Sequence, residues 1–269
     1  MQKVGEAIRT HIVPTPVAPV ETGKPECPIC KGAGWLRADL PVGHPHFGKP
    51  VMCECMLANV DTQRARELED LSALSQFHVD MSFDNFDSRV PGTRDAFEEA
   101  WRFSHNPDGW LVLVGGCGSG KTHLAVAIIR EARQSHLTLF VVVPDLLDHL
   151  RSTFSPDSGI RYDRLFDLVR NTGVLVLDDL GTESSTAWAQ EKLYQIINYR
   201  YNNHYPTVIT TNRRIDSIEE RIQSRICDRS FCKIVEMPSG DFRNLDLGQR
   251  QSGTTARPKP PLGRRQAGR

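Results

Sequence analysis

Residues 110–122 read WLVLVGGCGSGKT, and this stretch decides the fold. The first five residues are a continuous apolar run with the length of a buried strand. The next eight match the pattern G-x-x-x-x-G-K-[ST], and a helix is expected from Lys121 to about Ser135. A glycine-rich loop between a strand and a helix predicts backbone N–H groups that surround phosphate, aided by the positive end of the helix.

The residues of this loop have predicted parts in binding a nucleoside triphosphate. Lys121 is expected to reach the β- and γ-phosphates, and the Thr122 hydroxyl to ligate Mg²⁺. A glycine-rich turn without a ligand would explain the glycines but not the flanking strand and helix. The predicted nucleotide-binding residues are Gly115, Gly116, Cys117, Gly118, Ser119, Gly120, Lys121, Thr122 and His123.

Four more apolar runs alternate with helical patterns after the loop, which predicts an α/β fold with a five-stranded parallel sheet between helices. A helix over 93–104 is expected before the first strand. The further strands are expected at 137–143, 174–179, 207–212 and 231–237. Helices are expected at 145–153, 161–170, 186–202 and 216–226.

The third expected strand ends in paired carboxylates, VLVLDD, sixty residues after the glycine loop. Ligands of open α/β sheets bind at the carboxyl ends of the strands, so both acids are expected beside the loop. Asp178 is expected to hold Mg²⁺, directly or through water. Asp179 is expected to polarise the attacking water, and Glu183 is a weaker substitute.

The fourth expected strand, TVITTN, ends in Asn212, which could position the attacking water or cap the following helix. We favour the first role because of the two motifs that precede it. Arg221 and Arg225 stand four residues apart on one helical face. Such an arginine could complete a neighbouring subunit's site, but spacing alone favours a solvated face paired with Glu219 and Glu220.

The first quarter of the chain contains four of its seven cysteines, Cys27, Cys30, Cys53 and Cys55. Two close pairs of thiolates suit a tetrahedral Zn²⁺, and a short module would depend on such a metal to fold. No base or open position is evident, so the predicted zinc is structural. The C-x-C spacing of the second pair leaves His44 or His46 as substitutes, and free thiols in a loop as the alternative.

The composition places few limits on function, since 33 basic residues balance 33 acidic ones. No apolar run approaches the roughly 18 residues of a membrane helix, and the start lacks a signal-peptide core, so we expect a cytoplasmic protein. We predict a flexible leader at 1–25, the zinc module at 26–56, a helical linker at 57–80 (with its helix over 57–76), the ATPase core at 81–245 and a disordered basic tail at 246–269.

Several stretches together resemble the AAA+ ATPases, and within them the family of DnaC/DnaI helicase loaders and IstB transposition helpers. SFDNFD at 82–87 is similar to the segment before the core, and GGCGSGKTHLAVAI to the phosphate loop. Residues 174–212 are similar to the family's second acidic motif, helix and sensor strand. RIQSRI at 221–226 and DFRNL at 241–245 are similar to its closing part, so the resemblance covers about residues 80–245.

The resemblance implies roles for single residues. By it Arg225 looks like the arginine finger, with Arg221 nearby, Asn212 like the first sensor, and Arg243 like a second sensor. The segment 144–159 stands where relatives line a DNA path, and its basic residues are few: Arg151, with Arg161 and Arg164 just beyond.

The resemblance also implies partners and cofactors: ATP, a homo-oligomer that assembles on single-stranded DNA, and a replicative helicase that docks on the zinc module. A transposition helper, whose partner is a transposase, uses the same core. The zinc module before the core favours the loader. A third possibility, an adaptor that binds nucleotide without turnover, conflicts with the intact set of Lys121, Asp178, Asp179 and Asn212.

Overall fold

The computed structural model describes residues 24–37, 42, 44, 47, 49–74, 78, 80–153, 162–182 and 186–237. The chain forms two compact units, Met1–Arg66 and Glu67–Arg269, which divide within a single helix, α1 (Glu54–Leu71). Four residues singled out in the sequence lie outside the described ones, namely His46, Arg161, Glu183 and Arg243. No helix in the described part of the chain is both long and apolar enough to cross a membrane.

The second unit is built on a five-stranded sheet whose strands all run parallel, which confirms the predicted fold class. The strands are β3 (Trp110–Gly115), β4 (Thr138–Val142), β5 (Val174–Asp178), β6 (Thr207–Thr211) and β7 (Cys232–Met237). They lie in the order β4-β5-β6-β3-β7, so the strand before the glycine loop sits between β6 and the last strand, β7. The carboxyl ends of β3, β5 and β6 therefore share one edge.

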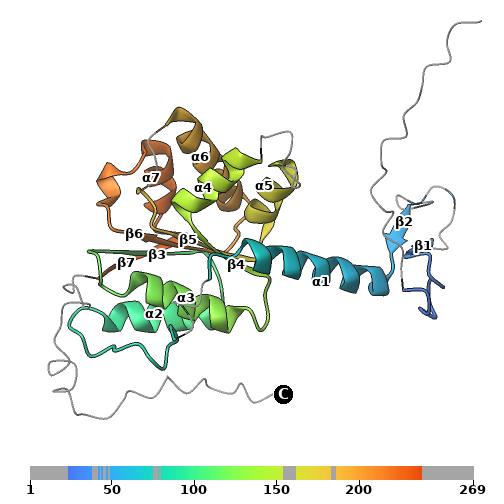
Figure 1. Ribbon diagram of the computed structural model, residues 1–269, viewed down its shortest axis with the longest axis horizontal. Helices are drawn as coiled ribbons and strands as arrows, with labels where there is room; N and C mark the ends of the chain where they lie inside the picture. The colour runs from blue at the N-terminus through green and yellow to red at the C-terminus, as the bar shows by residue number, and fades with distance from the viewer. Residues whose placement is uncertain are drawn as a thin grey trace, which may run out of the picture. The chain divides into compact units, whose positions relative to one another are not determined.

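Helices cover both faces of the sheet (Figure 1), and each face has its own apolar core. One layer holds α2 (Arg94–His105) and α3 (Lys121–Ala132). The other holds α4 (Val143–Ser152), α5 (Tyr162–Asn171), α6 (Ala187–Asn202) and α7 (Glu220–Ile226). Burial on both faces explains why the strands read as continuous apolar runs instead of alternating ones.

Two of the predicted helices differ most from the structure. The helix predicted at 57–76 begins at Glu54 and ends at Leu71, so Cys55 lies in its first turn. The helix predicted at 216–226 is a 3₁₀ turn, η2 (Ile215–Ser217), followed by the separate α7. The break occurs because the Glu219 carboxylate caps α7, accepting a hydrogen bond from the Ile222 N–H at 3.1 Å.

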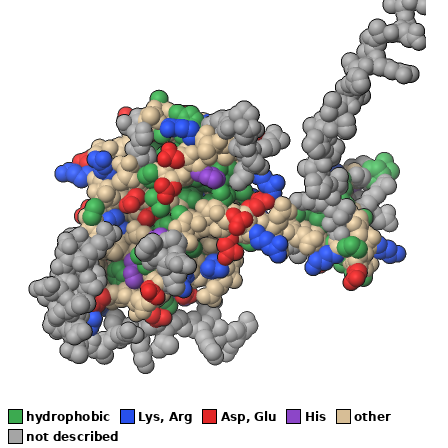
Figure 2. All heavy atoms as spheres, viewed as in Figure 1, with side chains coloured by type: hydrophobic (Ala, Val, Ile, Leu, Met, Phe, Trp, Pro, Cys, Tyr) green, Lys and Arg blue, Asp and Glu red, His purple; other side chains and the backbone are tan. Residues whose placement is uncertain are grey.

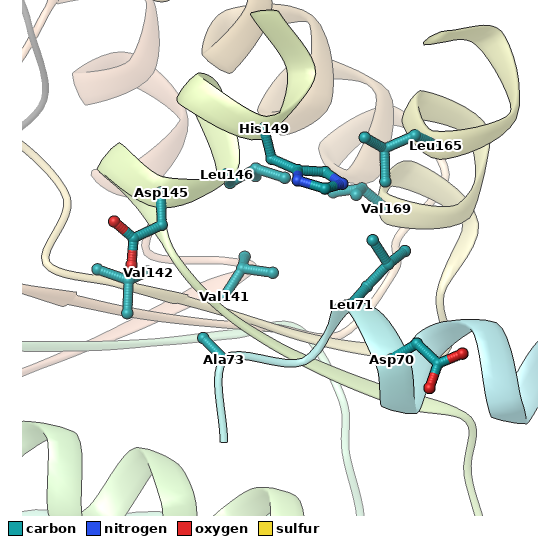
Figure 3. Close-up of a pocket in the computed structure, with 10 residues that line it drawn as sticks. All are labelled: Asp70, Leu71, Ala73, Val141, Val142, Asp145, Leu146, His149, Leu165 and Val169. Carbon is teal, nitrogen blue, oxygen red and sulfur yellow. The ribbon is translucent and has the colours of Figure 1, made fainter. Parts of the chain in front are cut away.

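The segment after α1 covers the edge strand β4. Ala73 donates its N–H to the Phe140 carbonyl at 2.9 Å, which satisfies part of an otherwise open strand edge. A cavity of about 170 Å³ remains between this segment, β4, α4 and α5. Figure 3 shows Asp70 and Asp145 on opposite sides of it, with His149 between them and apolar side chains along its floor. It is separate from the glycine loop.

A buried arginine ties the opposite, amino edge of the sheet together. Arg200 of α6 is fully buried. Its guanidinium donates to the Thr207 hydroxyl at 2.9 Å and to the carbonyls of Thr172 and Pro206, each at 2.7 Å. Burial lowers its pKa to about 9. This side chain therefore joins α6 to the starts of β5 and β6 through hydrogen bonds to neutral acceptors, a role that the sequence pattern did not reveal.

The first unit contains a short antiparallel pair, β1 (Trp35–Arg37) and β2 (Pro50–Met52), in which Trp35 lies opposite Met52. Its apolar core consists of Cys27, Cys30 and Cys53, with Leu36 and Cys55 packed against them. A core this small gives little hydrophobic stabilisation, so the unit needs another source of folding free energy.

Candidate functional site

The glycine loop joins the end of β3 to the start of α3 as expected. Gly118 and Gly120 have positive φ angles of 73° and 95°, which side chains with a Cβ rarely adopt. Lys121 folds over the loop, and its Nζ donates to the carbonyls of Gly115 at 2.9 Å and Gly116 at 2.8 Å. The ammonium therefore lies within the loop, where a phosphate oxygen could replace the carbonyls as its acceptor.

Asp178, at the end of β5, lies directly beside the loop. Its carboxylate accepts hydrogen bonds from the Thr122 hydroxyl at 3.1 and 3.2 Å and from the Thr210 hydroxyl at 2.7 Å. Burial raises the pKa of Asp178, and although the threonine hydroxyls lower it, the Asp179 charge raises it further. The hydroxyl and the carboxylate predicted to hold Mg²⁺ thus touch each other, and both are oxygen ligands of the kind that this ion prefers.

Asp179 and Asn212 stand at the same edge. Asp179 has a φ of +58° and donates its backbone N–H to the Thr210 hydroxyl at 3.0 Å. The Asn212 amide nitrogen lies 3.9 Å from the Cys117 sulfur, so it reaches the glycine loop from β6. Thr210 connects the two acids, and sequence reasoning missed it. A threonine pair at the end of an apolar strand, where a carboxylate ends the next strand, was the available signal.

The segment 82–87 packs against the other side of the loop. His123 donates its Nε2 proton to the Ser82 carbonyl at 2.8 Å, and burial lowers the pKa of its imidazole. The Phe86 ring lies 5.2 Å from that of His123 and so close to Gly120 that an added Cβ would approach it to 2.8 Å. A pocket of about 80 Å³ lies here, lined by Asn85, Phe86, Asp87, Val90, Thr93, Gly118, Ser119, Gly120 and His123.

This pocket is where a nucleotide base could lie when its phosphates occupy the loop. Phe86 offers an aromatic ring, and Asn85 and Asp87 offer polar groups beside it. None of these three residues was a predicted ligand. The sequence contained the segment but no base-reading pattern, because its place against the loop depends on the tertiary packing of Phe86 and His123.

A second, open cleft of about 740 Å³ flanks the loop on its other side. Gly115 and Gly116 form one wall, and Gln223 and Cys227 of α7 form part of the opposite one. Arg221 and Arg225 do not line this cleft; both pack against α6, where their Cζ atoms lie 4.1 and 4.8 Å from the ring centre of Tyr194. The structure therefore brings Lys121, Thr122, Asp178 and Asn212 together and leaves Arg225 outside this group.

The four cysteines of the first unit meet at one point. Their sulfur atoms all lie within 4.8 Å of one another, with Cys27 and Cys53 at 3.8 Å and Cys30 and Cys55 at 3.4 Å. Two ligands on a tetrahedral Zn²⁺ with Zn–S bonds of 2.3 Å are separated by about 3.8 Å. The two shorter separations are close to this value, and four thiolates are a donor set that zinc prefers, so the cluster fits a tetrahedral zinc ion. It forms without His44, and His46 lies outside the described residues.

The backbone turns around the cysteines hold their thiol groups close together. Lys31, Gly32 and Gly34 have positive φ angles, and the Cys53 N–H donates to the Gly34 carbonyl at 2.8 Å, which joins the two turns. Hydrogen bonds from the backbone N–H groups of Cys30 and Ile29 lower the pKa of Cys27 to about 6. A hydrogen bond from the Lys24 N–H lowers the pKa of Cys55. Burial and the neighbouring thiols outweigh this effect and raise the pKa of Cys55 to about 12.

Comparisons with known proteins give the family and the relatives of this chain. Residues 51–232 match the family model described as IstB-like ATP binding protein. The chain is 26% identical over 162 residues to the replicative helicase loader DnaC of Escherichia coli K12, a match covering 59% of this chain and 66% of that protein, just under two thirds.

Two solved structures have the same fold. A crystal structure of the DnaC helicase loader superposes with a TM-score of 0.54 at 28% identity, covering 61% of this chain and 99% of that one. A crystal structure of DnaI superposes with a TM-score of 0.52 at 26% identity, covering 65% and 98%.

Proposed function

The chain belongs to the family of IstB-like ATP binding proteins, with the AAA+ fold of the DnaC and DnaI helicase loaders, and from this premise we propose that it binds and hydrolyses ATP to load a replicative helicase on single-stranded DNA. One observation supports the ATPase activity above all. Lys121 and Thr122 from the loop, Asp178 from β5 and Asn212 from β6 converge on one edge of the sheet.

Each of these residues has a distinct part in the proposed reaction. Lys121 would exchange its loop carbonyls for oxygens of the β- and γ-phosphates. Thr122 and Asp178 would hold Mg²⁺, which neutralises the charge that develops on the phosphates. Since Thr122 and Asp178 already touch, little reorganisation would accompany binding, apart from the proton of the hydroxyl turning away from the carboxylate.

Asp179 would take the proton of the attacking water, and Asn212 would orient that water. The positive φ of Asp179 turns its backbone out of line with β5, and Thr210 fixes that turn from β6. Hydrolysis is tested by measuring phosphate release from ATP by the wild-type chain, Asp179→Asn and Lys121→Ala. We expect activity in the wild type alone, with ATP still bound by Asp179→Asn. Background release from all three would favour an adaptor that binds nucleotide without turnover.

The first unit is the proposed docking element for the helicase. All the large apolar side chains that are exposed in the described chain belong to it: Ile29, Trp35, Val42, Phe47, Val51 and Leu57. Zinc held by the four cysteines would stabilise a unit that presents so much apolar surface for contact with another protein. Capture of the replicative helicase by the full chain, and its loss in Ile29→Ser/Trp35→Ser, is the expected result.

Few basic side chains are available for contact with single-stranded DNA around α4 and α5 in the described part of the chain. Arg151 of α4 stacks on Trp188 with its Cζ 4.9 Å from the ring centre, and Arg164 of α5 pairs with Glu67. Figure 2 shows Lys and Arg interspersed with Asp and Glu over the described part of the face in view. We therefore expect binding with a shallow dependence on salt concentration, since few phosphates would be neutralised.

The family resemblance of the sequence extends to IstB transposition helpers, and the matching family model is described as IstB-like ATP binding protein, so a transposase is the alternative partner. The cysteine unit before the core favours the loader. Parallel capture experiments with the full chain, one with the replicative helicase and one with a transposase encoded near this protein, separate the two functions. Binding of the transposase alone would reverse our assignment.

A further inference from the structure

Helix α7 turns its two arginines away from the nucleotide site of its own chain. Ile222 and Ile226 are buried, and Gln223 and Cys227 line the cleft beside the glycine loop. At 3.6 residues per turn, the pair formed by Arg221 and Arg225 points about 160° away from the pair that faces the loop. A phosphate contacted by Arg225 in this orientation would therefore belong to another copy of the chain.

The guanidinium of Arg225 is held by α6. Its Nε donates to the Asn198 side-chain oxygen at 3.0 Å, and its Nη2 donates to that same oxygen and to the Tyr194 hydroxyl. Its Nη1 donates to the Arg221 carbonyl at 2.6 Å. One amide oxygen thus receives two N–H groups of the fork, and this fixes the plane of the guanidinium.

The acceptors around the two arginines differ in charge. Arg221 pairs with the carboxylates of Glu219 at 2.6 Å and Glu191 at 3.3 Å. Among the described residues, Arg225 has no carboxylate partner, and every acceptor that it contacts is neutral. No carboxylate therefore compensates the charge of Arg225, whereas two carboxylates compensate that of Arg221.

Resting on the proposed ATPase function, we infer that Asn198 is the positioning residue of an Arg225 that acts on the neighbouring copy. The amide oxygen of Asn198 holds the long, flexible side chain of Arg225 in one orientation and, being neutral, does not cancel the charge of the guanidinium. An arginine supplied by a neighbour increases the rate of phosphoryl transfer by about 10³ to 10⁵. A displacement of about 1 Å can forfeit about 100-fold of such an effect, so the acceptor that orients the guanidinium matters as well as the arginine.

The test uses two full-length chains that are each expected to be inactive. Asp179→Asn lacks its own hydrolytic base but keeps Arg225, and Arg225→Ala keeps the base but lacks the arginine. In an equal mixture that assembles at random, about a quarter of the interfaces join an intact base to an intact arginine, so about a quarter of the wild-type ATPase rate should return.

Asn198→Ala is then added to one chain at a time. In the Asp179→Asn chain, which donates the arginine, it should lower the recovered rate by up to about 100-fold. In the Arg225→Ala chain it should leave the recovered rate unchanged. Asn202→Ala, an exposed asparagine of the same helix, is the matched control and should have no effect in either chain.

Each other outcome overturns the inference. An equal loss in both chains would mean that Asn198 only stabilises the fold, and no loss in either would mean that Arg225 needs no positioning. A mixture that stays at background beside an active wild type would refute the action of Arg225 on a neighbour while leaving the ATPase assignment intact. A wild type without ATPase activity would refute the proposed function itself.

Discussion

Replacing Asp178 with Asn should abolish ATP hydrolysis and yet make the nucleotide-free protein more stable. Asp178 is 3% exposed, and the charge of Lys121 offsets only part of the effect of burial on the pKa of its carboxylate. Its contacts are two hydroxyls, from Thr122 and Thr210. The Asn side chain has nearly the same volume and an oxygen that can accept both hydrogen bonds, so it keeps the packing and removes a buried charge.

The direction of the effect follows from the pKa of Asp178, which burial raises. A carboxyl whose pKa is higher in the folded state stabilises that state at low pH, and this contribution is lost as the pH rises through the folded-state pKa. At pH 8 the wild type therefore bears the cost of a buried charge that Asp178→Asn does not. Removing such an unfavourable buried charge at a functional site should raise the free energy of unfolding by about 0.5–2 kcal/mol. Each kcal/mol raises the melting temperature of a unit of this size by about 2–4 °C.

The assay is thermal unfolding of the wild type and Asp178→Asn at pH 5 and pH 8, with and without Mg²⁺ and ATP. We expect the variant to melt higher at pH 8 and the difference to shrink at pH 5. With Mg²⁺ and ATP the wild type should gain more stability than the variant. Asp108→Asn, which changes an exposed carboxylate, should leave the melting temperature unchanged. If the variant melts below the wild type at pH 8, the buried charge of Asp178 does not destabilise the folded protein.

Three further outcomes are expected. Metal analysis should find about one zinc ion per chain, and Cys53→Ser should lose it while ATP binding by the second unit persists. Arg200→Met should lower the free energy of unfolding by about 1–3 kcal/mol in chemical denaturation, because the buried Thr172 carbonyl loses this donor, and Arg200→Lys should recover only part of this loss. Gly120→Ala should weaken ATP binding in calorimetry, since its φ of +95° and the nearby Phe86 ring together cost about 1–3 kcal/mol. Unchanged affinity in that last variant would contradict the tight packing of the loop.

The sequence predicted the parallel sheet and the residues that gather at its edge because those features are local. An apolar run, a glycine pattern and a carboxylate at a strand end each identify themselves within a few residues. The carboxyl ends of parallel strands then meet by topology, which is why Thr122 and Asp178 could be paired before the structure. The thiol cluster was predictable for a similar reason, since two close pairs of cysteines imply one tetrahedral ion.

The features that the sequence did not predict depend on contacts between distant segments. The strand order, which places β3 between β6 and β7, leaves no trace in local periodicity. Thr210 resembles any strand threonine until β5 and β6 are paired. Arg225 and Asn198 are 27 positions apart, and the orientation of the arginine depends on how α7 packs on α6. Phe86 became a candidate ligand only when its segment was found against the loop.

We propose that the glycine loop forms half of an ATPase site, which a second copy of the chain completes. The most direct test is to measure the rate of ATP hydrolysis per chain against protein concentration, with single-stranded DNA present. We predict that the rate per wild-type chain rises steeply with concentration and then reaches a plateau. The rate per Arg225→Ala chain should stay, at every concentration, at the value that the wild type has at low concentration. A rate per chain that is the same at every concentration, or equal to that of Lys121→Ala, would contradict the claim.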